Sequence, residues 1–298
     1  MRHRGSRPIV ATIAGVLFLL TPPSAAAQAP TKTAKPWQPS RTPDGQPDIQ
    51  GFWNREKIQQ VNENLQQDPE SPNLCTFDEL VRLDKGGMKP TKASQAIVDP
   101  PDGQIPYQPW TAAIRKQRLD NHLSPDPKLR DPVNSCFLVG VPRTQYQSEV
   151  QIVQTAGYVV LLFDFNHTNR IIALDGRPQL PENMKLWMGQ SRGRWEGNTL
   201  VVDVTNLNDR TWLDRAGNFH TDALRVVERW TFVNPDMIRY EATLDDPKAY
   251  TRPWKIAFNI DRIKEAGYEF LENACHEGTS TAPFTQNSPI EKPAQSPR

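Results

Sequence analysis

The sequence has almost no net charge and, beyond its first 20 residues, no long apolar run. Lys and Arg together number 35 and Asp and Glu 34, so the formal charge is +1. A nearly neutral chain lacks the basic footprint of a nucleic-acid-binding protein and the attraction to an anionic membrane surface. No later stretch is long and apolar enough for a transmembrane helix. We therefore expect neither a nucleic-acid partner nor a membrane span in the mature chain.

Several cofactor motifs are absent as well. The sequence has no G-x-G-x-x-G, no P-loop and no cysteine cluster with metal-site spacing, so nucleotide, phosphoryl and iron–sulfur chemistry have no support. His276 and Glu277 begin like the zinc motif H-E-x-x-H, but position 280 is Ser. We expect no cofactor, and a metal site only if distant residues such as His167 or His220 converge with His276.

The first 27 residues have the three parts of a secretory signal peptide. Arg2, Arg4 and Arg7 form a positive start, and residues 9–20 form an apolar stretch that is short for a membrane span. Residues 25–27 are all Ala, which suits cleavage. We expect cleavage near Ala27 and a periplasmic or secreted protein, and an uncleaved membrane anchor is the alternative.

Only three cysteines are present, namely Cys75, Cys136 and Cys275, and all follow the predicted signal peptide. An oxidising compartment permits one disulfide and one remaining thiol. We expect Cys136 to pair with Cys275, because each lies beside sequence that looks ordered. Three unpaired buried thiols are the alternative.

The region before the β signals is irregular. Residues 28–48 have the composition of a flexible linker, rich in Pro, Lys, Thr and Gln. Residues 49–148 are interrupted by Pro, with short helices expected at 76–83, where Thr76 and Glu79 have capping-box spacing, and at 110–122, with Thr111 as the N-cap. We expect this region to pack on the domain that follows it.

Residues 149–278 carry the signals of β-strands, and residues 279–298 look like a loose tail. Apolar and polar residues alternate over 238–245 and again over 254–261, which is typical of half-buried strands. Other strands are expected at 158–164, 170–174, 199–204, 224–233 and 268–275. Consecutive strands with short turns predict a mainly β fold, an antiparallel meander closed into a lipocalin-like barrel. A two-sheet sandwich is the alternative.

Several motifs occur in order along the chain: TPDGQPD at 42–48, GVPR at 140–143, DGR at 175–177, GRWEGNTLVVD at 193–203, YTRPW at 250–254 and CHEG at 275–278. Together they resemble a family of exported bacterial proteins of unassigned function. The similarity covers nearly all of the mature chain. It implies export and a β-rich domain, and it assigns no catalytic residues.

One further motif has a catalytic interpretation. Residues 189–193 read G-x-S-x-G, and Ser191, Asp246 and His276 follow the α/β-hydrolase order. That nucleophile motif requires a strand before it and a helix after it, whereas a β-hairpin follows here. We interpret its two glycines as residues that bend a strand at a barrel corner.

The candidate site rests on polar residues beside apolar strands. Glu228 lies between Val226 and Trp230 on a face that should be buried, so its carboxylate needs a partner, and an Arg–Glu pair inside the barrel would suit a structural role as well as a catalytic one. We expect His276, His167 and Arg170 to line one pocket at the open end of the barrel. The predicted catalytic residues are His276, His167, Glu228 and Glu277, and the predicted substrate-binding residues are Arg170, Arg194, Trp195, Trp230 and Tyr240.

Such a site suits an enzyme without a cofactor that uses His and carboxylate acid–base chemistry. A lyase, isomerase or hydrolase acting on a small ring-bearing substrate, such as a plant-derived aromatic or a sugar, would use the tryptophans as a wall. The alternative is a non-catalytic periplasmic binding or carrier barrel. A pocket with no convergent acid–base pair would favour that alternative.

Overall fold

The computed structural model describes residues 37–54, 65–66, 96–121, 124, 126, 129–166 and 168–270. Several sequence predictions lie outside these residues: the signal peptide, the helix at 76–83, Cys75, His167, Cys275, His276, Glu277 and the tail. Within the described ranges, every helix is too short or too polar to cross a membrane.

Most of the described chain is β-structure. The strands are β1 (Gly51–Asn54), β2 (Ile97–Asp99), β3 (Val150–Thr155), β4 (Tyr158–Phe163), β5 (Asn169–Ala173), β6 (Gln190–Glu196), β7 (Thr199–Thr205), β8 (Arg225–Asn234), β9 (Met237–Asp245) and β10 (Trp254–Arg262). The helices are α3 (Pro109–Asp120), the 3-10 helix η2 (Pro132–Ser135) and α4 (Thr144–Gln147).

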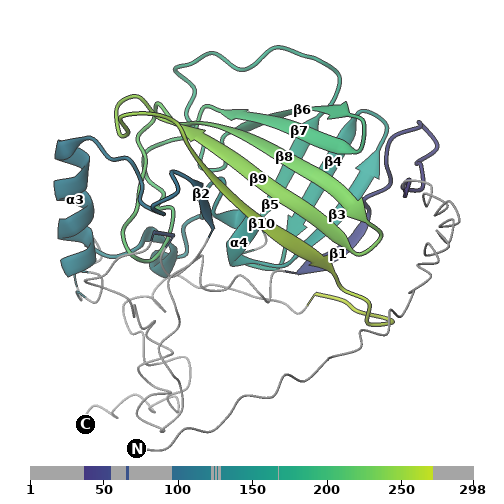
Figure 1. Ribbon diagram of the computed structural model, residues 1–298, viewed down its shortest axis with the longest axis horizontal. Helices are drawn as coiled ribbons and strands as arrows, with labels where there is room; N and C mark the ends of the chain where they lie inside the picture. Colours follow the sequence, from purple (N-terminus) through teal and green to yellow (C-terminus); the bar gives the residue numbers. More distant parts are fainter. Residues whose placement is uncertain are drawn as a thin grey trace, which may run out of the picture. The chain divides into compact units, whose positions relative to one another are not determined.

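Nine of the described strands close into a barrel in the order β1-β3-β4-β5-β6-β7-β8-β9-β10 (Figure 1). Closure is made by β1 and β10, where Trp53 pairs with Arg262 and Asn54 with Asp261. The short strand β2 pairs with β10 and lies outside the closed ring. The predicted barrel is therefore confirmed, and the alternative of a two-sheet sandwich is wrong.

One pair of neighbouring strands departs from the antiparallel order that the sequence predicts. Strands β5 and β6 are parallel, joined through the pairs Ile172–Ser191 and Ala173–Arg192, whereas all other neighbouring strands are antiparallel. Parallel neighbours need a long connection that carries the chain back to the starting end. Residues 174–189 supply that connection, and they return along the barrel near Leu207 through a bridge at Leu186.

The N-terminal region supplies one strand of the barrel itself. Strand β1 belongs to residues 49–148 yet closes the barrel, so the β domain is not confined to 149–278. At the other end, β10 stops at Arg262. The strand expected at 268–275 is not found in its described part, residues 268–270.

The helix predicted at 110–122 is confirmed as α3, although Gln108 rather than Thr111 is its N-cap. The Thr111 hydroxyl instead donates to the Ala249 carbonyl at 2.7 Å and fixes α3 to the barrel.

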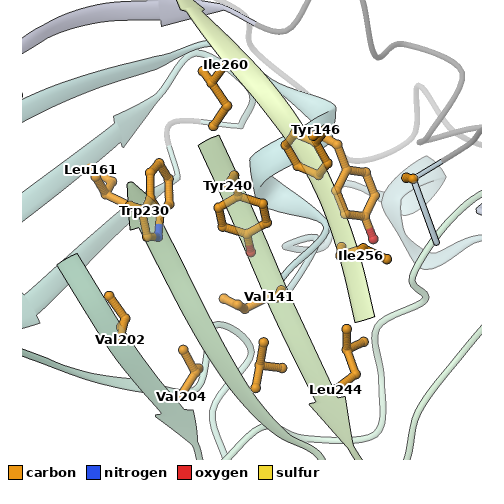
Figure 2. Close-up of a cluster of buried hydrophobic side chains, with 14 of the residues drawn as sticks. Val141, Tyr146, Leu161, Val202, Val204, Trp230, Tyr240, Leu244, Ile256 and Ile260 are labelled. Atoms are coloured by element: carbon orange, nitrogen blue, oxygen red, sulfur yellow. The ribbon is translucent and has the colours of Figure 1, made fainter. Parts of the chain in front are cut away.

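The barrel interior is filled by side chains rather than left open (Figure 2). Alternate residues of β8, β9 and β10 point inward, as the period-two pattern predicts. Among them Trp230, Tyr240 and Trp254 are at most 1% exposed. The one charged residue on the inward face of β8 is Glu228, which is 0% exposed.

The first prediction concerns barrel closure. Trp53 is fully buried, donates from its indole to the Ile49 carbonyl at 3.0 Å, and lies under the Arg262 guanidinium at 4.1 Å. We expect Trp53→Ala to lower the free energy of unfolding by about 3–5 kcal/mol, because it leaves a large cavity at the closing seam. Urea denaturation measures this. The control Val233→Ala, at an exposed position of β8, should change it by less than about 0.5 kcal/mol. Equal effects would show that closure contributes little.

Candidate functional site

A buried ion pair crosses the inside of the barrel. Arg170 on β5 donates through Nη1 to Oε1 of Glu228 at 3.1 Å and through Nη2 to Oε2 at 2.6 Å. The side chains are 1% and 0% exposed. Two parallel charge-assisted hydrogen bonds are the strongest form of such a pair. The structure thus supplies the buried partner that the sequence requires for Glu228.

Two neighbouring strands complete this cluster. Tyr240 on β9 donates its hydroxyl to Oε1 of Glu228 at 2.7 Å, and Ser191 on β6 accepts from Nη2 of Arg170 at 2.9 Å. Burial, followed by the charge of Glu228, raises the pKa of Tyr240 well above its ordinary value of 10.0, so the hydroxyl keeps its proton. Trp230 packs its ring edge-on against Tyr240, with centroids 5.0 Å apart. Both oxygens of Glu228 are therefore bonded and shielded from water.

A pocket of about 410 Å³ opens where β5 and β6 meet. Its walls come from the strands β4, β5 and β6 and from the connection 174–189. The lining residues are Tyr158, Asn169, Arg170, Ile171, Ala173, Arg177, Leu180, Leu186, Met188, Gly189, Gln190, Ser191 and Arg192. We call this the seam pocket. It reaches Arg170 and Ser191 of the buried cluster.

Three guanidinium groups line the seam pocket, and only two are paired with a carboxylate. Arg170 pairs with Glu228, and Arg177 pairs with Asp175, whose pKa Arg177 lowers to about 2. Arg192 donates to the carbonyls of Pro178 and Ser191 and, within the described residues, forms no ion pair. Burial, and then the charge of Arg177, lowers the pKa of Arg192. The pocket therefore holds one uncompensated positive charge.

Arg170 also keeps one donor unused. Its Nε is buried and has no hydrogen-bond partner among the described residues, although the side chain is 1% exposed. Buried donors of a charged group are rarely left unpaired, because an unmade bond costs about 1–3 kcal/mol or more. The buried cluster therefore carries one unsatisfied N–H inside the barrel.

The glycines of the G-x-S-x-G motif allow strands to approach closely. A Cβ on Gly193 would lie 2.6 Å from Cγ2 of Ile172, and one on Gly189 would lie 2.7 Å from the Thr205 carbonyl oxygen. Gly189 also has a φ of +61°, which favours glycine. Ser191 lies within strand β6 and no helix follows it. These contacts support the structural interpretation of the motif over a nucleophile elbow.

The structure separates the other predicted site residues. Arg194 is exposed on β6 and pairs with Glu196 at 2.7 Å, and Trp195 packs partly against the core. Trp230 and Tyr240 lie inside the barrel, next to Glu228 rather than in the seam pocket. The predicted convergence of His276, His167 and Glu277 with Arg170 lies outside the described residues and stays a prediction.

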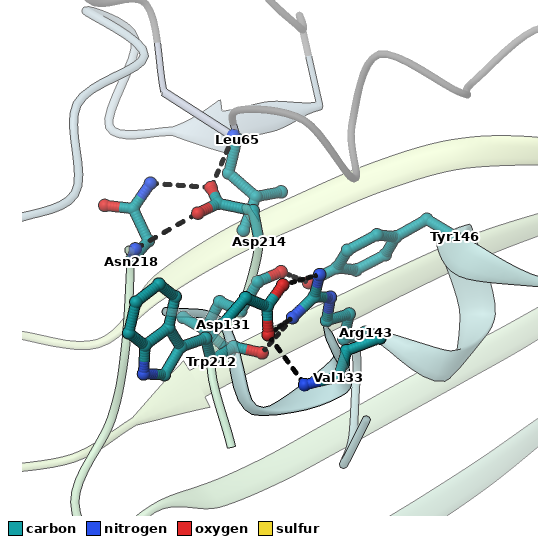
Figure 3. A network of polar contacts seen from close by, with 9 residues as sticks. Leu65, Asp131, Val133, Arg143, Tyr146, Trp212, Asp214 and Asn218 are labelled. Carbon is teal, nitrogen blue, oxygen red and sulfur yellow. Dashed lines mark hydrogen bonds and ion pairs between the residues drawn. The ribbon is translucent and has the colours of Figure 1, made fainter. Parts of the chain in front are cut away.

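A second buried network was missed by sequence reasoning (Figure 3). Arg143, from the GVPR motif, makes a two-pronged pair with Asp131 at 3.0 and 2.6 Å. Nearby, Asp214 accepts from the backbone of Leu65 and Asn218. Burial raises the pKa of Asp214. This network joins the N-terminal region to the connection between β7 and β8, and neither carboxylate lines the seam pocket.

A larger pocket, of about 630 Å³, lies beside α3. Among its charged side chains, Lys116 pairs with Asp120 at 3.1 Å and Arg252 pairs with Asp99 at 2.9 Å, and Asp102 and Arg115 also line it. The seam pocket is the candidate site because its lining, unlike that of the larger pocket, includes Arg170 of the buried cluster, a residue that the sequence predicts in the site.

Cys136 is disulfide-bonded. This result excludes three unpaired thiols. Both other cysteines lie outside the described residues, so pairing with Cys275 stays a prediction.

Comparison with models of protein families and with curated protein sequences gives no match to this chain. The resemblance to exported bacterial proteins therefore stays an expectation from the sequence motifs. The function has to be argued from the site itself.

The second prediction tests the buried pair by a double-mutant cycle. Glu228→Gln should lower the free energy of unfolding by about 3–5 kcal/mol, because it leaves the Arg170 charge buried without a counter-ion. Arg170→Met combined with Glu228→Gln should cost less than the sum of the single changes, with a coupling of about 0.5–3 kcal/mol. A control cycle on the exposed pair Arg225–Asp203 should give less than about 1 kcal/mol. Additive effects at both pairs would show that Arg170 and Glu228 do not stabilise the barrel as a pair.

The third prediction concerns pH. His220 is buried, with Nδ1 bonded to the Thr221 carbonyl and Nε2 to the Thr211 hydroxyl, each at 2.8 Å. Burial lowers its pKa below the ordinary 6.5, so the unfolded chain takes up the proton first. The stability that neutral His220 contributes is complete above about pH 6.5 and is lost as the pH falls below it, by at most about 1.4 kcal/mol per pH unit.

Urea titrations between about pH 7.5 and pH 5 measure this slope. The variant His220→Gln should be less stable at neutral pH and should lose less stability on acidification than the unchanged protein. An unchanged slope would show that another group controls the response.

Proposed function

We propose that this chain is an exported small-molecule-binding β-barrel that holds its ligand in the seam pocket. One observation carries the proposal: the described lining combines apolar side chains with three arginines and contains no carboxylate and no imidazole. Ligand sites are typically mostly apolar, with a few placed polar groups that orient the ligand. Export rests on the predicted signal peptide and on the motif resemblance.

The buried cluster supports binding more than proton transfer. A general acid or base must reach the substrate within hydrogen-bond distance. Glu228 is fully buried behind Arg170, and both of its oxygens already accept hydrogen bonds. In this arrangement Glu228 holds Arg170 in place.

Ser191 lacks the surroundings of a nucleophile. Its Oγ accepts a hydrogen bond from Arg170, and the one described histidine, His220, is bonded to Thr211 and Thr221 instead. A serine nucleophile needs a base in hydrogen-bond contact. The enzyme hypothesis therefore depends on His276, His167 and Glu277, which lie outside the described residues.

The fourth prediction tests binding at this pocket. A thermal-shift screen of the mature chain against small aromatic and aliphatic compounds, both charged and neutral, should raise the melting temperature with some of them. Leu186 lines the pocket, and Met184 is a similarly exposed residue of the same connection that does not. Leu186→Asp should weaken the binding of those compounds about tenfold or more, since it removes apolar contact and adds a competing charge.

Met184→Asp is the matched control and should leave the affinity unchanged. If no compound stabilises the chain, or if both variants bind as the unchanged protein does, the seam pocket is not a ligand site. Steady conversion of a bound compound, lost on His276→Ala with the fold retained, would favour the enzyme alternative instead.

A further inference from the structure

We infer that the ligand of the seam pocket is a monoanionic organic acid, with its carboxylate at Arg192 and its apolar body against the connection 174–189. This inference rests on the proposed function, because it specifies the chemistry of the molecule that the pocket holds. It follows from the charge of the pocket, the place of Arg192 and the apolar wall, taken in turn.

The charge balance calls for one negative charge. Glu228 compensates Arg170, and Asp175 compensates Arg177. Arg192 remains with carbonyl partners alone among the described residues, and it is partly buried next to Arg177. A single carboxylate would neutralise the pocket, whereas a doubly charged phosphate would leave an excess negative charge in a partly buried place.

Arg192 defines where the carboxylate would sit. Ser191 and Arg170 face the barrel interior, where Nη2 of Arg170 donates to the Ser191 hydroxyl. Arg192 follows Ser191 directly on β6, so its side chain points to the opposite, outer face and lines the pocket there. The planar guanidinium group of Arg192 matches the two-oxygen shape of a carboxylate.

The remaining walls are apolar. Ile171 is 58% exposed on the outer side of β5, and Leu180, Leu186 and Met188 of the connection line the same pocket. A hydrophobic side chain exposed to this degree beside a cationic group gives an amphipathic site. A volume of about 410 Å³ suits a small ring or a short alkyl chain rather than a polymer.

The fifth prediction compares acids with neutral analogues of the same shape. Isothermal titration calorimetry on the mature chain would use 3-phenylpropanoate and octanoate, each against its primary amide, with inorganic phosphate as a further probe. We expect at least one acid to bind about tenfold more tightly than its amide, and that advantage to shrink as salt is added. Phosphate alone should not bind measurably.

Variants on β6 locate the charge that matters. Arg192→Gln should abolish the advantage of the acid over its amide, and Arg192→Lys should retain part of it. Arg194→Gln, two residues along the same strand and outside the pocket, is the matched control and should leave the advantage intact. Circular dichroism and urea denaturation would show whether each variant folds. If Arg192→Gln does not fold, the salt dependence of acid binding by the unchanged protein tests the inference instead.

These outcomes distinguish a failure of the inference about the organic acid from a failure of the proposed binding function. Equal affinity for acid and amide, equal effects of Arg192→Gln and Arg194→Gln, or tight binding of phosphate alone would overturn the inference about the organic acid. If neither member of any pair binds while other compounds in the screen do, the inference also fails and the binding function stands. If nothing in the screen binds, the proposed function itself fails.

Discussion

The ion pair between Arg170 and Glu228 is the constraint on which the barrel interior depends. Two charges are placed among aromatic and aliphatic side chains, where desolvation costs several kcal/mol per ion. That cost is offset only because Glu228 also accepts from Tyr240 and Arg170 also donates to Ser191. The cluster thereby fixes how β5, β6, β8 and β9 face one another, and a shift of any of these strands by one residue would turn a charge outward or leave one unpaired.

The same constraint explains why the pocket lies at the junction of β5 and β6. These strands share only two residue pairs, and glycine at position 193 lets them approach within contact of Ile172. Because the pair is parallel, the chain must travel back outside the barrel before β6 begins. Residues 174–189 therefore place apolar side chains opposite the outer face of β5, a short distance from the buried Arg170.

Period-two alternation was sufficient to predict β8, β9 and β10, and it showed that Glu228 points into the core. It could not predict the parallel seam, since alternation gives the faces of a strand and not the direction of its neighbour. Strand β1 was missed because four residues, Gly51–Asn54, are too few to show a period. Arg192 looked like an ordinary residue of a glycine motif, and its lack of a counter-ion follows only from where the carboxylates of Asp175 and Glu228 lie.

The hydrogen bonds of the cluster converge on Glu228 and connect it, through Arg170, to the wall of the pocket. Tyr240 and Arg170 both donate to this carboxylate, and Arg170 also donates to Ser191, which lines the pocket. Hydrogen bonds that share a group polarise one another when the dielectric constant is low. The cluster therefore holds together the strands that carry the pocket. Since the unfolded chain has no such site, ligand binding and barrel stability would rise together.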